Sequence, residues 1–157
     1  MKIKYFLITI ICASISLTSC SEEESSKLSS ESEMLTAKSW VVQSKIVEPS
    51  INLGGIEISD ITVLDSDEVK SYSFKFDSDG TLVVTDLSEE IIIETTWVFN
   101  SDKTQLTFGD PLIYNYPIVG DIGLSTIKIT SLTSSKMIGT IPAFYDDINY
   151  VVTITFI

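Results

Sequence analysis

The side chains of this chain restrict its chemistry to carboxylates, lysines and hydroxyls. The 157-residue sequence contains no histidine, all ten of its basic residues are lysines, and its two cysteines are Cys12 and Cys20. The absence of histidine excludes imidazole bases and the common zinc sites. The absence of arginine excludes bidentate recognition of phosphate or carboxylate. We therefore predict no catalytic residues, no metal ligands and no cofactor, and we expect a protein that is not an enzyme.

The motif closest to a metal site is Asp77-Ser78-Asp79-Gly80. Its Asp-x-Asp-Gly pattern is that of the start of an EF-hand calcium loop. The position that needs a bidentate glutamate falls on Ser88, however, and an alternating aromatic segment precedes the motif where a helix is required. We therefore predict a hairpin turn, for which aspartate and glycine supply the geometry directly.

Two acidic clusters, Asp65-Ser66-Asp67-Glu68 and Asp146-Asp147, are the other concentrations of ionisable groups. Both are predicted to be solvated turns, and no spacing between carboxylates singles out a glycosidase pair. Phe144 and Tyr145 precede the second cluster. They either contact a ligand at the mouth of a barrel or cap the end of the barrel as core, and we expect the core role.

The segment before Cys20 has the pattern of an export signal. Lys2 and Lys4 precede an apolar run that is too short for the roughly 20 residues of a spanning helix, and Leu17-Thr18-Ser19-Cys20 follows. This arrangement resembles the bacterial lipoprotein signal and its lipobox. The resemblance implies cleavage before Cys20 and a thioether-linked diacylglycerol on it, with acyl chains such as palmitate holding the protein at a membrane. Residues 1–19 are then a signal peptide; the alternatives are an ordinary secretory signal and an uncleaved anchor.

Residues 20–34 are rich in serine and glutamate and are predicted to be a flexible tether. Acidic residues directly after the cysteine resemble the surface-export signal of Bacteroidota lipoproteins, which implies the outer face of the outer membrane; the periplasmic face is the alternative. Removing residues 1–19 takes away Cys12 and two lysines, which lowers the formal net charge from −12 to −14. Such acidity disfavours nucleic acid and anionic membrane surfaces as partners.

Residues 35–157 are predicted to form a single all-β domain. Glu31 to Lys38 is expected to form a short helical turn, and Tyr72, Phe74 and Phe76 show the alternation of a half-buried strand. About ten such candidates recur at the spacing of roughly 8–12 residues typical of sandwiches and barrels. They are 40–47, 56–64, 72–76, 81–87, 91–99, 105–108, 112–118, 126–132, 136–141 and 150–157.

Short connections between these candidates favour antiparallel neighbours. Closure of the sheet would remove exposed edges, so we predict an up-and-down antiparallel barrel of about 8–10 short strands, with an open β-sandwich as the alternative. The last strand, 150–157, is expected to close the barrel against the first. Trp40 and Trp97 are expected to fill the interior, as side chains do in small barrels.

Several segments of this domain resemble the lipocalin-like domain of Bacteroidota lipoproteins. They are Trp40, then 74–81 with its Asp-Gly hairpin, then 96–99 with 105–107, and finally 127–133 with 136–138. Lys38 stands where lipocalins proper carry the glycine of Gly-x-Trp. The resemblance implies a small antiparallel barrel with room for an internal cavity, and it implies no chemistry.

These observations predict a lipid-anchored protein of the cell envelope whose membrane partner is reached through Cys20. Its barrel is expected to bind a small apolar ligand or glycan. The alternative is a structural or adhesive surface protein with a packed barrel whose loops contact another macromolecule; no protein partner is indicated. A cavity of about 300 Å³ or more would keep internal ligand binding open, and a solid interior would exclude it.

Overall fold

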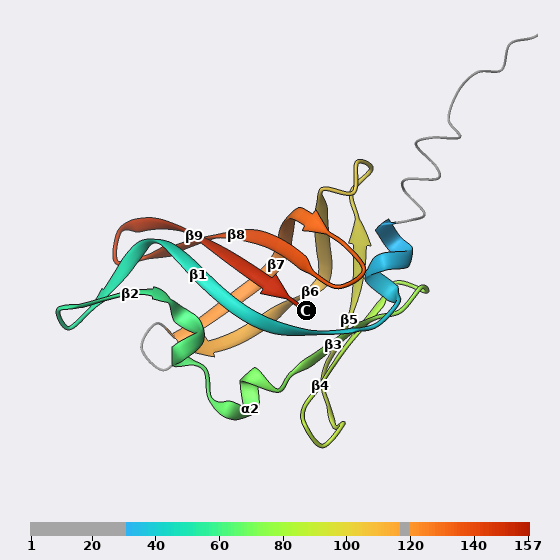
Figure 1. Cartoon of the computed structure of the whole chain (residues 1–157), viewed down its shortest axis with the longest axis horizontal. Helices are drawn as coiled ribbons and strands as arrows, with labels where there is room; N and C mark the ends of the chain where they lie inside the picture. The colour runs from blue at the N-terminus through green and yellow to red at the C-terminus, as the bar shows by residue number, and fades with distance from the viewer. Residues whose placement is uncertain (1–30, 117–119) are drawn as a thin grey trace, which may run out of the picture.

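The computed structural model describes residues 31–116 and 120–157 (Figure 1). The signal peptide, Cys20 and the first part of the tether therefore lie outside the described residues. A helix at 31–36 leads into nine strands and two short helical segments. They are β1 (Ser39–Leu53), β2 (Ile56–Asp60), the 3-10 helix η1 (Ile61–Leu64), α2 (Asp67–Lys70), β3 (Ser73–Phe76), β4 (Thr81–Thr85), β5 (Ile91–Phe99), β6 (Gln105–Tyr116), β7 (Gly120–Leu132), β8 (Met137–Tyr145) and β9 (Ile148–Phe156).

Eight of these strands close into an antiparallel barrel. The neighbours run β1-β3-β4-β5-β6-β7-β8-β9, and β9 returns to pair with β1, where Ile154 lies opposite Lys45. This closure confirms the predicted barrel over the sandwich, and it confirms that the last strand seals the sheet against the first. β2 is an additional strand that pairs with the second half of β1, with Ile58 opposite Ile51.

The long strand β1 uses one edge for two partners. Residues Ser39, Trp40 and Val41 pair with β3, whereas residues from Ile46 onward pair with β2. The other edge of β1 pairs with β9. Between the β2 and β3 portions of that shared edge the chain forms η1 and α2, which lie beside β1 in Figure 1. These two short helices therefore cover the barrel where β1 has no neighbouring strand on that edge.

The helix at 31–36 covers one end of the barrel. Leu35 and Trp40 are fully buried there, and the indole Nε1 of Trp40 donates to the carbonyl oxygen of Leu35 at 2.8 Å. The ammonium of Lys38 lies 4.4 Å from the ring centroid of Trp40 and donates to the carbonyl of Ser135 at 3.4 Å. The predicted helical turn and the predicted interior position of Trp40 are both confirmed. Lys38 thus ties this end to the turn between β7 and β8.

Two strand predictions differ from the structure for local reasons. The segment predicted as one strand over 56–64 ends at Asp60, because the Asp60 carboxylate accepts from the backbone N–H of Thr62 at 3.0 Å and starts η1. The candidates 105–108 and 112–118 are one strand, β6, which is interrupted relative to β7 by an irregularity between Thr107 and Leu112. The described residues therefore contain nine strands where ten were predicted.

The predicted hairpin turn at Asp77–Gly80 is confirmed. The N–H of Asp77 donates to the carbonyl of Thr81 at 2.8 Å, and Gly80 has a φ of +90°, a conformation that a side chain would strain. The half-buried Trp97 donates from Nε1 to the carbonyls of Asp77 and Thr81, at 3.1 Å each. Its indole therefore fastens the turn to β5. It also packs edge-on against the buried rings of Phe76 and Phe99, so Trp97 contributes to the core while it stays half-buried.

Candidate ligand-binding site

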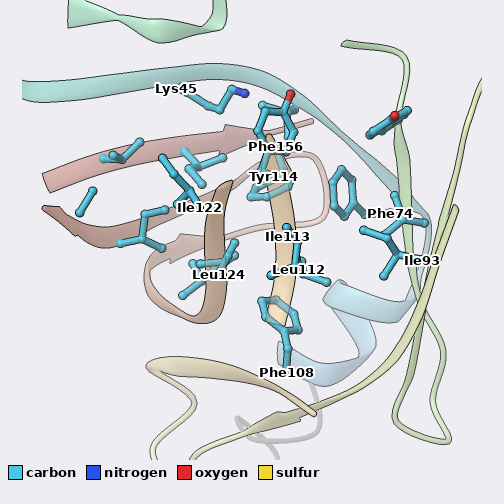
Figure 2. Close-up of a pocket in the computed structure, with 18 of the residues that line it drawn as sticks. Lys45, Phe74, Ile93, Phe108, Leu112, Ile113, Tyr114, Ile122, Leu124 and Phe156 are labelled. Carbon is cyan, nitrogen blue, oxygen red and sulfur yellow. The ribbon is translucent and has the colours of Figure 1, made fainter. Parts of the chain in front are cut away.

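The barrel contains a cavity of about 120 Å³ (Figure 2). Aliphatic and aromatic side chains from all eight strands of the barrel make most of its wall. They include Phe74, Ile93, Phe108, Leu112, Ile122 and Leu124. An interior with this lining holds apolar groups and offers few partners to water, so the cavity favours apolar contents.

One side of the cavity adjoins the place where β5 and β6 part. Their registered pairs run from Trp97 with Phe108 to Phe99 with Leu106, whereas the earlier residues of β5 pair with β4 and the later residues of β6 pair with β7. The divergence follows the irregularity in β6, where Pro111 has no N–H to contribute to a ladder. Interior side chains such as Ile93 and Leu112 consequently stand apart across an incompletely filled space.

Two contacts bring β5 and β6 close together just before they diverge. The backbone N–H of Asp110 donates to Oγ1 of the buried Thr95 at 2.9 Å. A Cβ placed on Gly109 would overlap Oγ1 of Thr96, so a larger residue at this position would require the Thr96 side chain to move. The site is thus shaped by backbone geometry as much as by the size of its lining side chains.

A cluster of three polar side chains borders one end of the cavity. Nζ of Lys45 lies 2.6 Å from Oδ1 and 2.6 Å from Oδ2 of Asp65, and the hydroxyl of Tyr114 donates to Oδ1 of Asp65 at 3.1 Å. Nζ of Lys45 also lies 4.3 Å from the centroid of the Tyr114 ring. The side chains of Lys45 and Asp65 are only 9% and 2% exposed. This is a buried, hydrogen-bonded ion pair rather than a surface contact.

The short helices position Asp65 in this cluster. The backbone N–H of Lys45 donates to Oγ1 of Thr62 at 2.6 Å, which attaches η1 to β1. Asp65 directly follows η1 and donates its own N–H to the carbonyl of Thr62 at 3.2 Å. Ser66 then caps α2 by accepting from the N–H of Val69 at 3.2 Å. Backbone contacts on both sides therefore hold the Asp65 carboxylate toward the barrel.

The prediction that the Asp65–Glu68 cluster is a solvated turn is wrong for Asp65. Asp67 and Glu68 are exposed in the first turn of α2, but Asp65 is buried against Lys45. The partner that buries it lies 20 residues earlier in the chain, so the sequence around Asp65 carries no sign of it.

Burial shifts the ionisation of two groups that line the cavity. Desolvation lowers the pKa of Lys45, and the hydrogen bond and charge of Asp65 oppose this shift. Burial also raises the pKa of Tyr72, with the nearby carboxylates of Glu68 and Asp86 acting in the same direction. The lowered pKa of Lys45 reflects the loss of hydration at its buried ammonium group.

The aromatic pair on β8 does not form the predicted core cap. Phe144 is 66% exposed, whereas Tyr145 is half-buried beside the core. Both residues belong to β8, in which successive side chains point to opposite faces, so they cannot both face inward. The prediction is therefore wrong for Phe144. Asp146 and Asp147, in the turn after β8, are exposed as predicted.

Residues 31–116 and 120–157 contain no group of three or more His, Cys, Asp or Glu side chains that could hold a metal ion. In the Asp77–Gly80 turn the carboxylate of Asp79 accepts from the N–H of Thr81 at 2.9 Å. Hydrogen bonds from Thr81 lower the pKa of Asp79. This carboxylate thus has a structural use in closing the turn.

Sequence reasoning missed Lys45 and Tyr114 as site residues. A lysine between the apolar residues Val42 and Val47 was the available signal, but strict alternation from Trp40 would point position 45 outward. The register of β1 against β9 shifts between Val42 and Ser44, and this shift brings Lys45 to the interior.

Comparison with known proteins adds no relative. No protein-family model matches the chain, and no match was found among curated proteins. None of the helices in residues 31–116 and 120–157 is long and apolar enough to cross a membrane. The class that the structure defines is an eight-stranded antiparallel β-barrel with a small apolar cavity and a buried ion pair at its border.

Proposed function

We propose that this protein is a lipid-anchored, lipocalin-like protein of the cell envelope that holds a small apolar ligand inside its barrel. The observation that carries the binding role is the cavity of about 120 Å³ with its aliphatic and aromatic wall. An apolar cavity of about 150 Å³ in another protein stays dry and takes up benzene or xenon. The cavity described here is close to that size.

The size of the cavity favours a small molecule over a glycan. It is below the roughly 300 Å³ expected for an internal ligand-binding site, so a drug-sized ligand does not fit and the proposal is confined to a smaller molecule. A sugar would also bury many hydroxyl groups against side chains such as Phe108 and Leu124, which offer no hydrogen bonds. A ligand of about the size of one aromatic ring fits both the volume and the lining.

The anchor and location rest on the sequence of the first residues. The lipobox-like Leu17-Thr18-Ser19-Cys20 supports lipidation of Cys20, and the acidic residues that follow it support display on the outer face of the outer membrane. A diacylated cysteine binds a membrane stably, because each buried methylene contributes about 0.8 kcal/mol. The barrel would then meet its ligand at the membrane surface.

Ligand binding is tested by titrating benzene into the isotope-labelled protein and following backbone amide shifts. Val42→Phe extends a cavity-lining side chain into the space and should abolish the saturable shifts. Val98→Phe is the matched control, because Val98 is 60% exposed on β5 and its replacement should leave binding unchanged. Absence of saturable binding in the unaltered protein would reject the proposal.

Anchoring is tested by replacing Cys20. Cys20→Ser should abolish the lipid-bearing N-terminal peptide seen by mass spectrometry and release the protein from the membrane fraction. Protease treatment of intact cells should remove the barrel if it is displayed outside. A barrel that is digested only after lysis would place the protein on the periplasmic side, and an unlipidated Cys20 in the unaltered protein would reject the anchor.

A structural or adhesive role is the second candidate, and exposed apolar side chains on the β8–β9 hairpin favour it. Phe144, Ile148 and Val151 are 66%, 44% and 49% exposed. Native mass spectrometry of the protein extracted from its own cells separates the two roles. A retained small molecule supports the cavity, whereas a protein partner that is lost in Phe144→Ser supports the hairpin surface.

A further inference from the structure

Nearly all of the cavity wall is apolar, and two members of the polar cluster, Lys45 and Tyr114, are among its lining residues. Figure 2 shows Lys45 and Tyr114 at one end, with Phe108 and Leu124 toward the other. Among the described residues that line the cavity, Lys45 is the one charged side chain. A ligand that fills the space therefore meets hydrocarbon along most of its length and the polar cluster at one end.

The charges of the cluster restrict what that end of a ligand can be. Lys45 and Asp65 form a formally neutral pair with N–O distances of 2.6 Å. A ligand carboxylate would stand beside the Asp65 carboxylate and compete with it for Lys45, and a ligand ammonium would stand beside Lys45. Either charged group would also lose its hydration in the apolar cavity. An uncharged hydroxyl or carbonyl avoids both penalties.

We propose that the ligand of this cavity is amphipathic, with an apolar body the size of one ring and a single uncharged oxygen directed at the Lys45–Asp65–Tyr114 cluster. This inference rests on the proposed ligand-binding function and specifies its ligand class. The hydroxyl of Tyr114 is the specificity-determining group: its hydrogen is donated to Asp65, so toward a ligand hydroxyl it acts as an acceptor. The desolvation that lowers the pKa of Lys45 strengthens hydrogen bonds at this end.

Four probes of similar size separate the ligand classes: benzene, phenol, benzoate and benzylamine. Each is titrated into the purified protein near pH 7 while backbone amide shifts are recorded. Phenol is expected to bind about fivefold more tightly than benzene, which corresponds to roughly 1 kcal/mol, a usual net value for one hydrogen bond. Benzoate and benzylamine, both charged at this pH, are expected to bind more weakly than benzene.

Tyr114→Phe removes the hydroxyl but keeps the ring, and it should reduce the phenol preference toward unity while benzene binding persists. Tyr72→Phe removes the hydroxyl of another tyrosine that lines the cavity and tests whether that group carries the preference instead. Tyr145→Phe is the matched control, because Tyr145 lies outside the lining of this cavity and its replacement should keep the preference. A thermal melt confirms that each variant is folded.

The outcomes distinguish this inference from the function beneath it. Benzene binding with no advantage for phenol, or equal binding of benzoate, overturns the ligand class and leaves the apolar binding function standing. Loss of the preference in Tyr72→Phe and not in Tyr114→Phe overturns the assignment to the cluster. Failure of all four probes to bind overturns the proposed function and this inference together.

Discussion

Removing the positive charge of Lys45 should destabilise the barrel far more than removing an exposed lysine. In Lys45→Met the chain length of the side chain is roughly kept, but the Asp65 carboxylate, 2% exposed, is left buried without its cationic partner. Loss of one member of a buried pair typically costs about 3–5 kcal/mol of unfolding free energy. With a urea m-value of about 2 kcal/mol/M, the midpoint should fall by roughly 2 M.

Lys75→Met is the matched control for this experiment. Nζ of Lys75 lies 2.9 Å from Oδ1 of Asp77, but the two side chains are 59% and 37% exposed. Exposed pairs of this kind contribute about 0–1 kcal/mol, because water and salt screen the charges. The same substitution should therefore shift the urea midpoint by no more than roughly 0.5 M at the m-value used above.

The double variant Lys45→Met/Asp65→Leu completes the measurement. Replacing both charges by apolar groups removes the orphaned carboxylate, so the double variant should be markedly more stable than Lys45→Met and near the unaltered protein. Urea unfolding at 25 °C, followed by tryptophan fluorescence, gives all of these values. A Lys45→Met variant no less stable than Lys75→Met, or a double variant as unstable as Lys45→Met, would refute the assignment of a buried, coupled pair.

Two further predictions concern packing and pH. Gly139→Ala should lower the unfolding free energy by about 1–3 kcal/mol, because the added Cβ would overlap the buried side chain of Ile127. Gly123→Ala should be tolerated, because the nearest atom to its added Cβ is 3.4 Å away, and urea unfolding compares the two variants. Because the pKa of Tyr72 is raised in the folded state, it contributes stability at pH values below 10.0, the ordinary pKa of tyrosine, and this contribution is lost as the pH rises above that value. Tyr72→Phe should therefore flatten the fall of the unfolding free energy at alkaline pH. Equal slopes in the unaltered protein and in Tyr72→Phe would contradict the assignment for Tyr72.

The elements that could be predicted are those whose cause is local. The turn at Asp77–Gly80 follows from the conformations that aspartate and glycine adopt, and it formed as predicted. The segment over 61–64 shows the limit of such reasoning. Its alternating residues are compatible with a strand, but the Asp60 carboxylate caps a 3-10 turn there, and two local preferences in competition cannot be ranked from the pattern alone.

The candidate site depends on contacts between distant residues. Asp65 is separated from Lys45 by 20 positions and from Tyr114 by 49, so no local pattern joins them. The alternation rule failed for Lys45 because of the register shift after Val42. The prediction for Phe144 failed because the segment was interpreted as a loop, whereas its place on β8 points the ring outward.

The sequence by itself determined the all-β class, the turns and the order of the strands, because alternation and turn chemistry act over a few residues. It also provides every basis for the expected signal peptide and for lipidation at Cys20. Only the tertiary structure decided that β5 and β6 part to leave a cavity and that Lys45, Asp65 and Tyr114 meet at its border. The physical reason is that closure of a barrel joins residues far apart in the chain, and small irregularities in β1 and β6 determine which of them face inward.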